Sequence, residues 1–265
     1  MKRFYFPERV WLQSAFLLLA AIPATLVAME FDPRTVNDIN IWIKPLKFYI
    51  STALHLATLA LLVRFLPDRA RGGKALAIVA AVSAFAALAE IAIIAAQSAR
   101  GVASHFNNAT QFDAVIYIFM GLGALLIIMP AIVLGVWFLR TPVTDKLTPG
   151  LKLGAGLGFT LGFILTLGIA GYMAQQPTGH WVDGTPTDAG GLPLFGWSRE
   201  GGDLRVPHFF ATHLMQALPL VGYAADKMFG SAGAAKRVVW IAAGLGVALT
   251  IGLFVQALNG QAFIG

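Results

Sequence analysis

The chain contains no cysteine among its 265 residues, and this absence excludes disulfide bonds, iron–sulfur clusters and metal sites built from thiolates. Charge is scarce as well. Asp, Glu, Lys and Arg together make up 12% of the chain, which is about half of their share in soluble domains. Hydrophobic residues make up 57%. This composition predicts a polytopic membrane protein.

Seven apolar runs are long enough to cross a membrane, because a hydrocarbon core about 30 Å thick needs roughly 20 helical residues. They lie near residues 10–28, 43–65, 76–97, 114–138, 151–173, 206–228 and 238–258. The runs predict an all-α bundle of seven transmembrane helices that forms a single domain over residues 1–265. The fifth run carries Gly154, Gly158 and Gly162, a spacing that favours close packing against another helix.

Lys and Arg are concentrated in alternate connections, and this asymmetry predicts the orientation. The basic segments are the N-terminus, with Lys2, Arg3 and Arg9, and the connections after the second, fourth and sixth runs. The remaining connections hold most of the acidic residues. We therefore expect a cytoplasmic N-terminus and an external C-terminus. The net charge of +6 is accounted for by the inner segments, so no nucleic-acid partner is expected.

Two of the runs carry a line of polar side chains. The residues are Lys44, Lys47, Ser51 and His55 in the second run, and Arg205, His208, Thr212 and Gln216 in the sixth. Successive members are three, four and four residues apart, which places each set on one face of a helix. Titratable groups at membrane depth usually face a bundle interior or a water-filled cavity. The two stripes therefore indicate a polar interior, and their likeness suggests a 3+1+3 parallel repeat.

Further polar residues are expected to complete a site that opens to the outer side, under a lid formed by the connection 174–204. The candidate catalytic residues are Glu90, Asp113 and Ser51. The candidate metal ligands are His208, His213, His55 and His105. The candidate substrate-binding residues are Lys44, Lys47, Arg100, Asn107, Arg205 and Gln216. Imidazole suits zinc and other transition metals, and a carboxylate beside the metal is a candidate general base on metal-bound water.

Each of these groups has a structural alternative. Glu90 is a lone carboxylate in the third run, where it either pairs with a lysine or carries a proton, binds a metal or acts as a base. Asp113 also suits the start of a helix, where a negative charge is favourable. His208 and His213 are five residues apart and so point about 140° apart on a helix, which also fits two hydrogen-bonded interior histidines.

The chain resembles a family of uncharacterised bacterial seven-helix membrane proteins in three segments, which read KPLKFYIS at 44–51, RGVASHFN at 100–107 and GGDLRVPHF at 201–209. It is also similar in part to the alkaline ceramidase and adiponectin-receptor superfamily of membrane zinc hydrolases. Those proteins pair Ser-x-x-x-His on the second helix with two histidines on the last helix. Ser51 and His55 match the first part, whereas His208 and His213 depart from the second in helix and spacing.

The leading hypothesis is a metal-dependent enzyme, with zinc favoured over iron, that acts on an anionic lipid-like substrate at the outer leaflet of a bacterial inner membrane. The first alternative is a redox module that binds haem or quinone, with His55 and His213 as axial ligands. The second is a proton-coupled transporter or channel in which Lys47, Glu90 and His55 form a relay. Expected partners are a membrane lipid or amphiphilic small molecule, a second copy of the chain, or another membrane subunit.

Overall fold

The structure is a computed structural model that describes residues 4–265, so Lys2 and Arg3 lie outside the described residues. The chain forms two compact units, 1–130 and 131–265. Within the described residues, six helical segments are long and apolar enough to cross a membrane: Phe6–Phe31, Ile43–Phe65, Lys74–Ala99, Gln111–Arg140, Pro149–Met173 and Ala232–Leu258. The protein is therefore an all-α polytopic integral membrane protein. That the two units form one domain stays a prediction.

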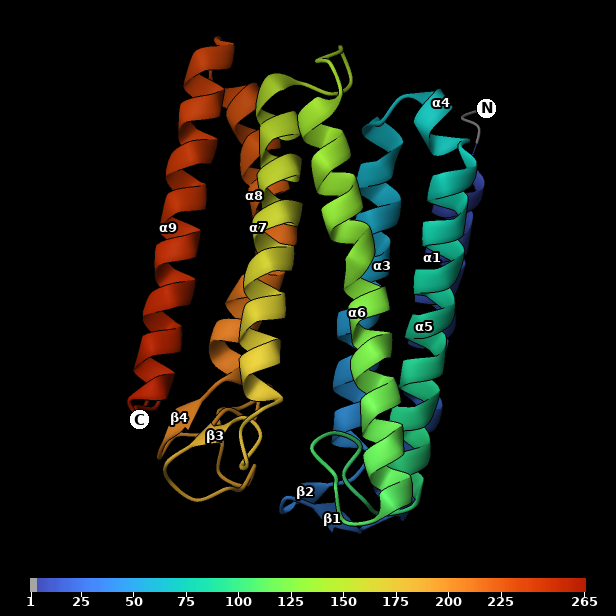
Figure 1. The fold of residues 1–265 in the computed structure, drawn as a ribbon, viewed down its shortest axis with the longest axis vertical. Helices are drawn as coiled ribbons and strands as arrows, with labels where there is room; N and C mark the ends of the chain where they lie inside the picture. Colours follow the sequence, from blue (N-terminus) through green and yellow to red (C-terminus); the bar gives the residue numbers. More distant parts are fainter. Residues whose placement is uncertain (1–3) are drawn as a thin grey trace. The chain divides into compact units, whose positions relative to one another are not determined.

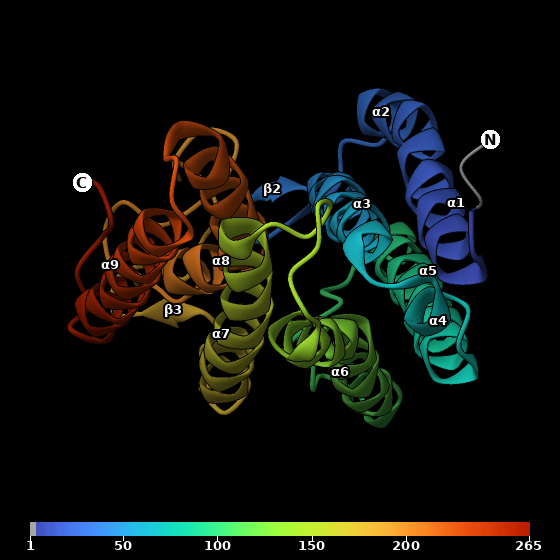
Figure 2. The same ribbon diagram turned by 90° about the horizontal axis from the view of Figure 1, so that it is seen from above.

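Unit 1 is built from α1 (Phe6–Ala20), α2 (Ile22–Phe31), α3 (Ile43–Leu62), the 3-10 turn η1 (Val63–Phe65), α4 (Asp68–Arg71), α5 (Lys74–Ala99) and the first part of α6 (Gln111–Arg140). The helices α1, α3 and α5 lie side by side and pack on one another (Figures 1 and 2). A short antiparallel pair, β1 (Thr35–Val36) and β2 (Ile39–Asn40), precedes α3 and sets Thr35 opposite Asn40.

Unit 2 is built from the rest of α6, α7 (Pro149–Met173), β3 (Trp181–Val182), β4 (Gly202–Asp203), α8 (Arg205–Met228) and α9 (Ala232–Leu258). The helix α8 packs along both α7 and α9 (Figure 1). The strands β3 and β4 are antiparallel, with Trp181 opposite Asp203. The sixth of the seven expected membrane-spanning helices, near 206–228, coincides with α8, which has 24 residues but falls outside the six apolar segments. Its polar stripe is the reason, because the same residues that mark the site lower its hydropathy.

The glycine face of α7 explains why α7 and α8 pack most closely. A Cβ atom added at Gly154 would collide with the backbone carbonyl of Leu218, and one added at Gly158 would lie 2.6 Å from the carbonyl oxygen of Leu214. Glycine alone lets the two backbones approach this far, because it has no side chain to hold them apart. The prediction of close packing at these glycines is confirmed.

In each unit, the loops that were predicted to lie outside share one end. In unit 1, the Arg34 Nη2 donates a hydrogen bond of 3.0 Å to the carbonyl of Ala99, which ties the α2–α3 connection to the end of α5. In unit 2, Gly202 in the α7–α8 connection lies directly against the carbonyl of Ala257, near the end of α9 (Figure 1). Within each unit the helices thus alternate in direction, as the Lys/Arg distribution predicts.

Candidate functional site

The centre of unit 1 contains a buried carboxylate on α5. Glu90 is 4% exposed, and its Oε1 has no hydrogen-bond partner within the described residues. The other oxygen, Oε2, lies where a Cβ atom on Gly123 of α6 would come within 2.7 Å. Gly123 therefore makes the room that the carboxylate occupies. The charge of Lys44 on α3 acts on Glu90.

His105 approaches the same carboxylate from the α5–α6 connection. Its Nε2 lies 3.6 Å from Glu90 Oε1, while its Nδ1 forms a hydrogen bond of 3.0 Å with Ser104 Oγ. The imidazole packs against the ring of Phe48 on α3, with the centroids 5.5 Å apart. The turn after His105 is held in place locally, because Asn107 Nδ2 donates to the carbonyl of Ala103 and Asn107 Oδ1 accepts from the amide of Ala109. Asn107 thus shapes the loop that presents His105.

The members of the first polar stripe differ in burial and in their contacts within unit 1. Lys44 and Lys47 are half-buried, whereas Ser51 is exposed and its Oγ donates back to the carbonyl of Phe48 at 3.3 Å. His55 is buried, and its Nε2 donates to the carbonyl of Ile127 at 3.1 Å. That carbonyl lies one turn from Pro130, which interrupts the backbone hydrogen bonds of α6. His55 therefore stabilises the proline-containing part of α6, and only Nδ1 is left for another ligand.

Arg100 and Asp113 form a cluster at the start of α6. Arg100 Nη1 lies 2.9 Å from Asp113 Oδ1, which also accepts a bond of 3.1 Å from Gln97 Nε2. Thr110 Oγ1 donates to Asp113 Oδ2 at 2.7 Å, and the amide of Asp113 donates back to Thr110 Oγ1. These bonds match the structural alternative for Asp113, a negative charge in the first turn of a helix that Thr110 caps. The guanidinium of Arg100 is engaged in this cluster through its ion pair with Asp113.

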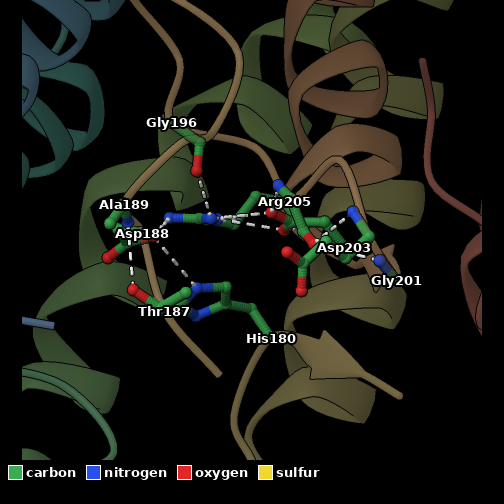
Figure 3. Close-up of polar contacts among 10 residues, drawn as sticks. His180, Thr187, Asp188, Ala189, Gly196, Gly201, Asp203 and Arg205 are labelled. Atoms are coloured by element: carbon green, nitrogen blue, oxygen red, sulfur yellow. Dashed lines mark hydrogen bonds and ion pairs between the residues drawn. The ribbon is translucent and has the colours of Figure 1, made fainter. Parts of the chain in front are cut away.

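In unit 2, Arg205 holds the connection between α7 and α8 (Figure 3). Its guanidinium lies between two carboxylates, with Nη1 at 2.6 Å from Asp188 Oδ1 and Nη2 at 2.7 Å from Asp203 Oδ2. Nη2 also donates to the carbonyl of Gly196 at 2.7 Å. His180 approaches the same oxygen of Asp188, with its Nε2 at 3.8 Å from Oδ1. We call the segment 174–204 with Arg205 the Arg205 clasp.

Loss of the Arg205 side chain is expected to destabilise this loop. Arg205→Met leaves the carboxylates of Asp188 and Asp203 buried without their counter-charge, and breaking a buried pair in this way costs about 3 kcal/mol or more. The thermal unfolding midpoint of the purified protein in detergent should fall by several degrees. Arg199→Met is the matched control, because Arg199 is an exposed arginine of the same loop. Equal midpoints for the two variants would contradict the claim that Arg205 stabilises this loop.

The Arg205 clasp should also loosen in acid. Burial raises the pKa of Asp188, but His180 and the charge of Arg205 lower it further, to about 2. A carboxyl whose pKa is lowered by folding stabilises the protein at pH values above about 4, its ordinary pKa. That contribution is lost as the pH falls toward 2. Burial lowers the pKa of His180, so the folded loop resists protonation of this imidazole. As the pH falls below the ordinary histidine pKa, this resistance also reduces the stability of the folded loop.

Limited proteolysis of the 174–204 loop over a pH series measures this opening. Cleavage should rise as the pH falls below about 6.5, where an unperturbed histidine takes up a proton, and rise again below about 4. Asp188→Asn should remove the second rise. Cleavage that does not change between pH 7 and pH 3 would show that the clasp does not depend on these two groups.

The histidines of α8 make contacts within unit 2. His213 Nδ1 donates to the carbonyl of Phe209 at 2.7 Å, and the rings of these two residues lie 3.9 Å apart. This bond leaves Nε2 of His213 as the nitrogen able to bind a metal. Thr212 Oγ1 donates to the carbonyl of His208 and contacts Thr166 Oγ1 of α7 at 3.2 Å. Gln216 is half-buried one turn further along α8.

Within residues 4–265, no three His, Asp or Glu side chains gather as a metal site requires. Glu90 and His105 come together, and they supply two donors. The sequence did not indicate Asp188, His180 or Gly123. The Asp203-x-Arg205 spacing could have indicated one clasp contact, because an aspartate two residues before an arginine can bond both its amide and its guanidinium.

Comparison of the chain with protein-family models, with curated proteins and with solved structures finds no match.

Proposed function

We propose that this protein is a proton-coupled membrane transporter in which Glu90 and His105 take up and release a proton. The observation that carries the proposal is the carboxylate of Glu90: it is buried inside a membrane-spanning segment, and its Oε1 has no hydrogen bond yet lies 3.6 Å from an imidazole nitrogen. A carboxylate is costly to keep in such a place unless it gains a proton or a partner. A proton carrier alternates between the protonated and the ionised carboxyl.

His105 provides the path between water and Glu90. Its side chain is 21% exposed, whereas that of Glu90 is 5% exposed, so the imidazole lies between solvent and the buried carboxylate. Imidazole exchanges protons near neutral pH and can pass one onward. The separation of 3.6 Å is longer than a hydrogen bond, so a small movement of either side chain makes or breaks the transfer.

Through Lys44, the protonation of Glu90 changes how strongly the protein attracts an anion. The ionised carboxylate offsets the charge of Lys44, whereas the protonated form does not. Lys44 and Lys47 lie on the same face of α3, so a proton on Glu90 increases the attraction of this face for an anion. By linkage, a bound anion then also favours the proton. An anionic solute would therefore move together with a proton.

The repeated architecture supports transport. In unit 1 the helices α1, α3 and α5 pack together, and in unit 2 the helices α7, α8 and α9 do so, with a short antiparallel β pair before α3 and before α8. The two polar stripes occupy these equivalent helices, α3 and α8. We propose that the units are a duplicated repeat and that α8 also crosses the membrane, which makes seven spans in all. Many transporters rely on such a repeat for alternating access.

An infrared pH titration of the reconstituted protein tests the proton site directly. A protonated carboxylic acid has a carbonyl stretch that its anion lacks, so a band that titrates and disappears in Glu90→Gln belongs to Glu90. We expect such a band, together with uptake of small carboxylates or phosphate esters driven by an imposed pH gradient. A titration identical in the wild type and Glu90→Gln would exclude a proton carrier at this position.

A metal-dependent enzyme is the second candidate, because the Nδ1 bond of His213 to a backbone carbonyl is the arrangement typical of a histidine that binds metal through Nε2. Elemental analysis of protein purified without chelator separates the candidates. Stoichiometric zinc that His213→Ala removes would favour the hydrolase of a lipid-like substrate. Iron with a coloured sample would favour haem.

A further inference from the structure

A cavity of about 290 Å³ lies in unit 2 at the end opposite the Arg205 clasp. It is formed where α6 ends and where α7 and α9 begin. Its lining residues are Leu139, Val143, Pro149, Lys152, Leu153, Lys236 and Trp240. By the Lys/Arg distribution, this end of unit 2 faces the cytoplasm, and none of these residues belongs to the polar sites described above.

The cavity combines two cations with an apolar wall. Lys152 is half-buried and Lys236 is exposed, and neither takes part in the ion pairs within residues 4–265. Asp226 on α8 reaches the same end of the unit, but its carboxylate accepts hydrogen bonds from Thr148 Oγ1 and from the amides of Gly150 and Leu151. Asp226 therefore holds the start of α7, and the two lysines give the cavity a net positive charge.

The apolar side of the cavity continues onto the membrane-facing surface. Trp240 is 58% exposed, and Ile241 and Leu245, which follow it on α9, are 63% and 67% exposed. Tryptophan is enriched at the level of lipid headgroups, where its ring meets acyl chains and its N–H meets water. The cavity therefore has cations on its polar side and an open apolar wall. A freely soluble anion would contact only the cations and would leave the apolar wall unused.

We propose that this cavity binds the headgroup of an anionic phospholipid from the cytoplasmic leaflet. Lys152 and Lys236 would contact the phosphate oxygens, and the acyl chains would lie along Leu139, Trp240 and the exposed face of α9. Basic pockets between membrane helices on the cytoplasmic side are suited to this recognition, because the phosphate gains charge-assisted hydrogen bonds without leaving the interface. The proposal is independent of transport, because it uses no residue of the Glu90 site.

Native mass spectrometry of the detergent-purified full chain tests this proposal. The wild type should retain one phosphatidylglycerol in preference to phosphatidylcholine, and Lys152→Gln with Lys236→Gln should weaken that binding by roughly tenfold or more. Arg237→Gln is the matched control, because it removes a neighbouring exposed cation of α9 that does not line the cavity. Equal retention by the double variant and the control would overturn the proposal, as would displacement of the lipid by millimolar inorganic phosphate.

Fluorescence quenching provides a measurement that does not depend on the folding of the lysine variant. Phosphatidylglycerol brominated on its acyl chains should quench wild-type fluorescence more than brominated phosphatidylcholine does. The excess should disappear in Trp240→Phe, which retains the other tryptophans. An excess that persists in Trp240→Phe would place the lipid elsewhere and overturn the assignment to this cavity.

Discussion

Replacing Gly154 with valine is expected to lower the free energy of unfolding by about 3 kcal/mol. The Cβ atom of valine would collide with the carbonyl of Leu218, which belongs to the backbone of α8 and cannot rotate away as a side chain can. The two helices must then separate along the contact that holds unit 2 together. The thermal unfolding midpoint in detergent micelles, followed by circular dichroism, measures the loss.

Gly168→Val is the matched control for this prediction. Gly168 is on the same helix, and no atom lies within 4 Å of a Cβ added there. Both variants add the same side chain within one helix and change its helix propensity alike, so a lower midpoint for Gly154→Val reports the collision. Equal midpoints would show that α7 and α8 are not held at the separation described here.

The helices of this protein could be predicted from the sequence because a long apolar run in a membrane has one way to satisfy its backbone hydrogen bonds. The fourth run was expected near 114–138, and α6 extends over Gln111–Arg140. The first run was expected as one helix near 10–28, whereas the structure has α1 and α2 with a break at Ala21. Pro23 explains the break, because proline lacks the amide that would continue the first helix.

The site could be predicted only in part, because a helical stripe shows which residues share a face but not what they contact. Glu90 and His105 were both expected, and they come within 3.6 Å of each other. His55 was expected as a ligand, yet its Nε2 bonds to a carbonyl beside Pro130, a contact that depends on how α3 packs on α6. Asp188 was not expected, because its contact with Arg205 crosses a loop without periodicity.

Glu90→Gln is expected to abolish proton exchange while raising the free energy of unfolding by about 1–2 kcal/mol, because it replaces a buried carboxylate whose Oε1 lacks a hydrogen bond with a neutral amide of the same shape. Replacing a structural residue lowers the stability of the protein, whereas replacing a residue kept for function often raises it. The infrared titration and the thermal midpoint are measured on the same sample. Glu200→Gln, at an exposed loop position, is the control and should change neither. A lower midpoint for Glu90→Gln would instead identify Glu90 as a structural partner of Lys44.

A pair of alanine variants on α6 tests the same site without removing the carboxylate. Gly123→Ala would place a Cβ atom 2.7 Å from Glu90 Oε2 and push the flexible end of that side chain, whereas Gly121→Ala meets no atom within 4 Å. Because only the tip of a side chain must move, both variants should fold. Gly123→Ala should nevertheless alter the pH at which the carboxyl band titrates, since it changes the distance between Glu90 and His105. If Gly121→Ala has the same effect, the space that Gly123 leaves is not what positions the proton site. If Gly123→Ala alone has it, the contact between α5 and α6 controls the chemistry of Glu90.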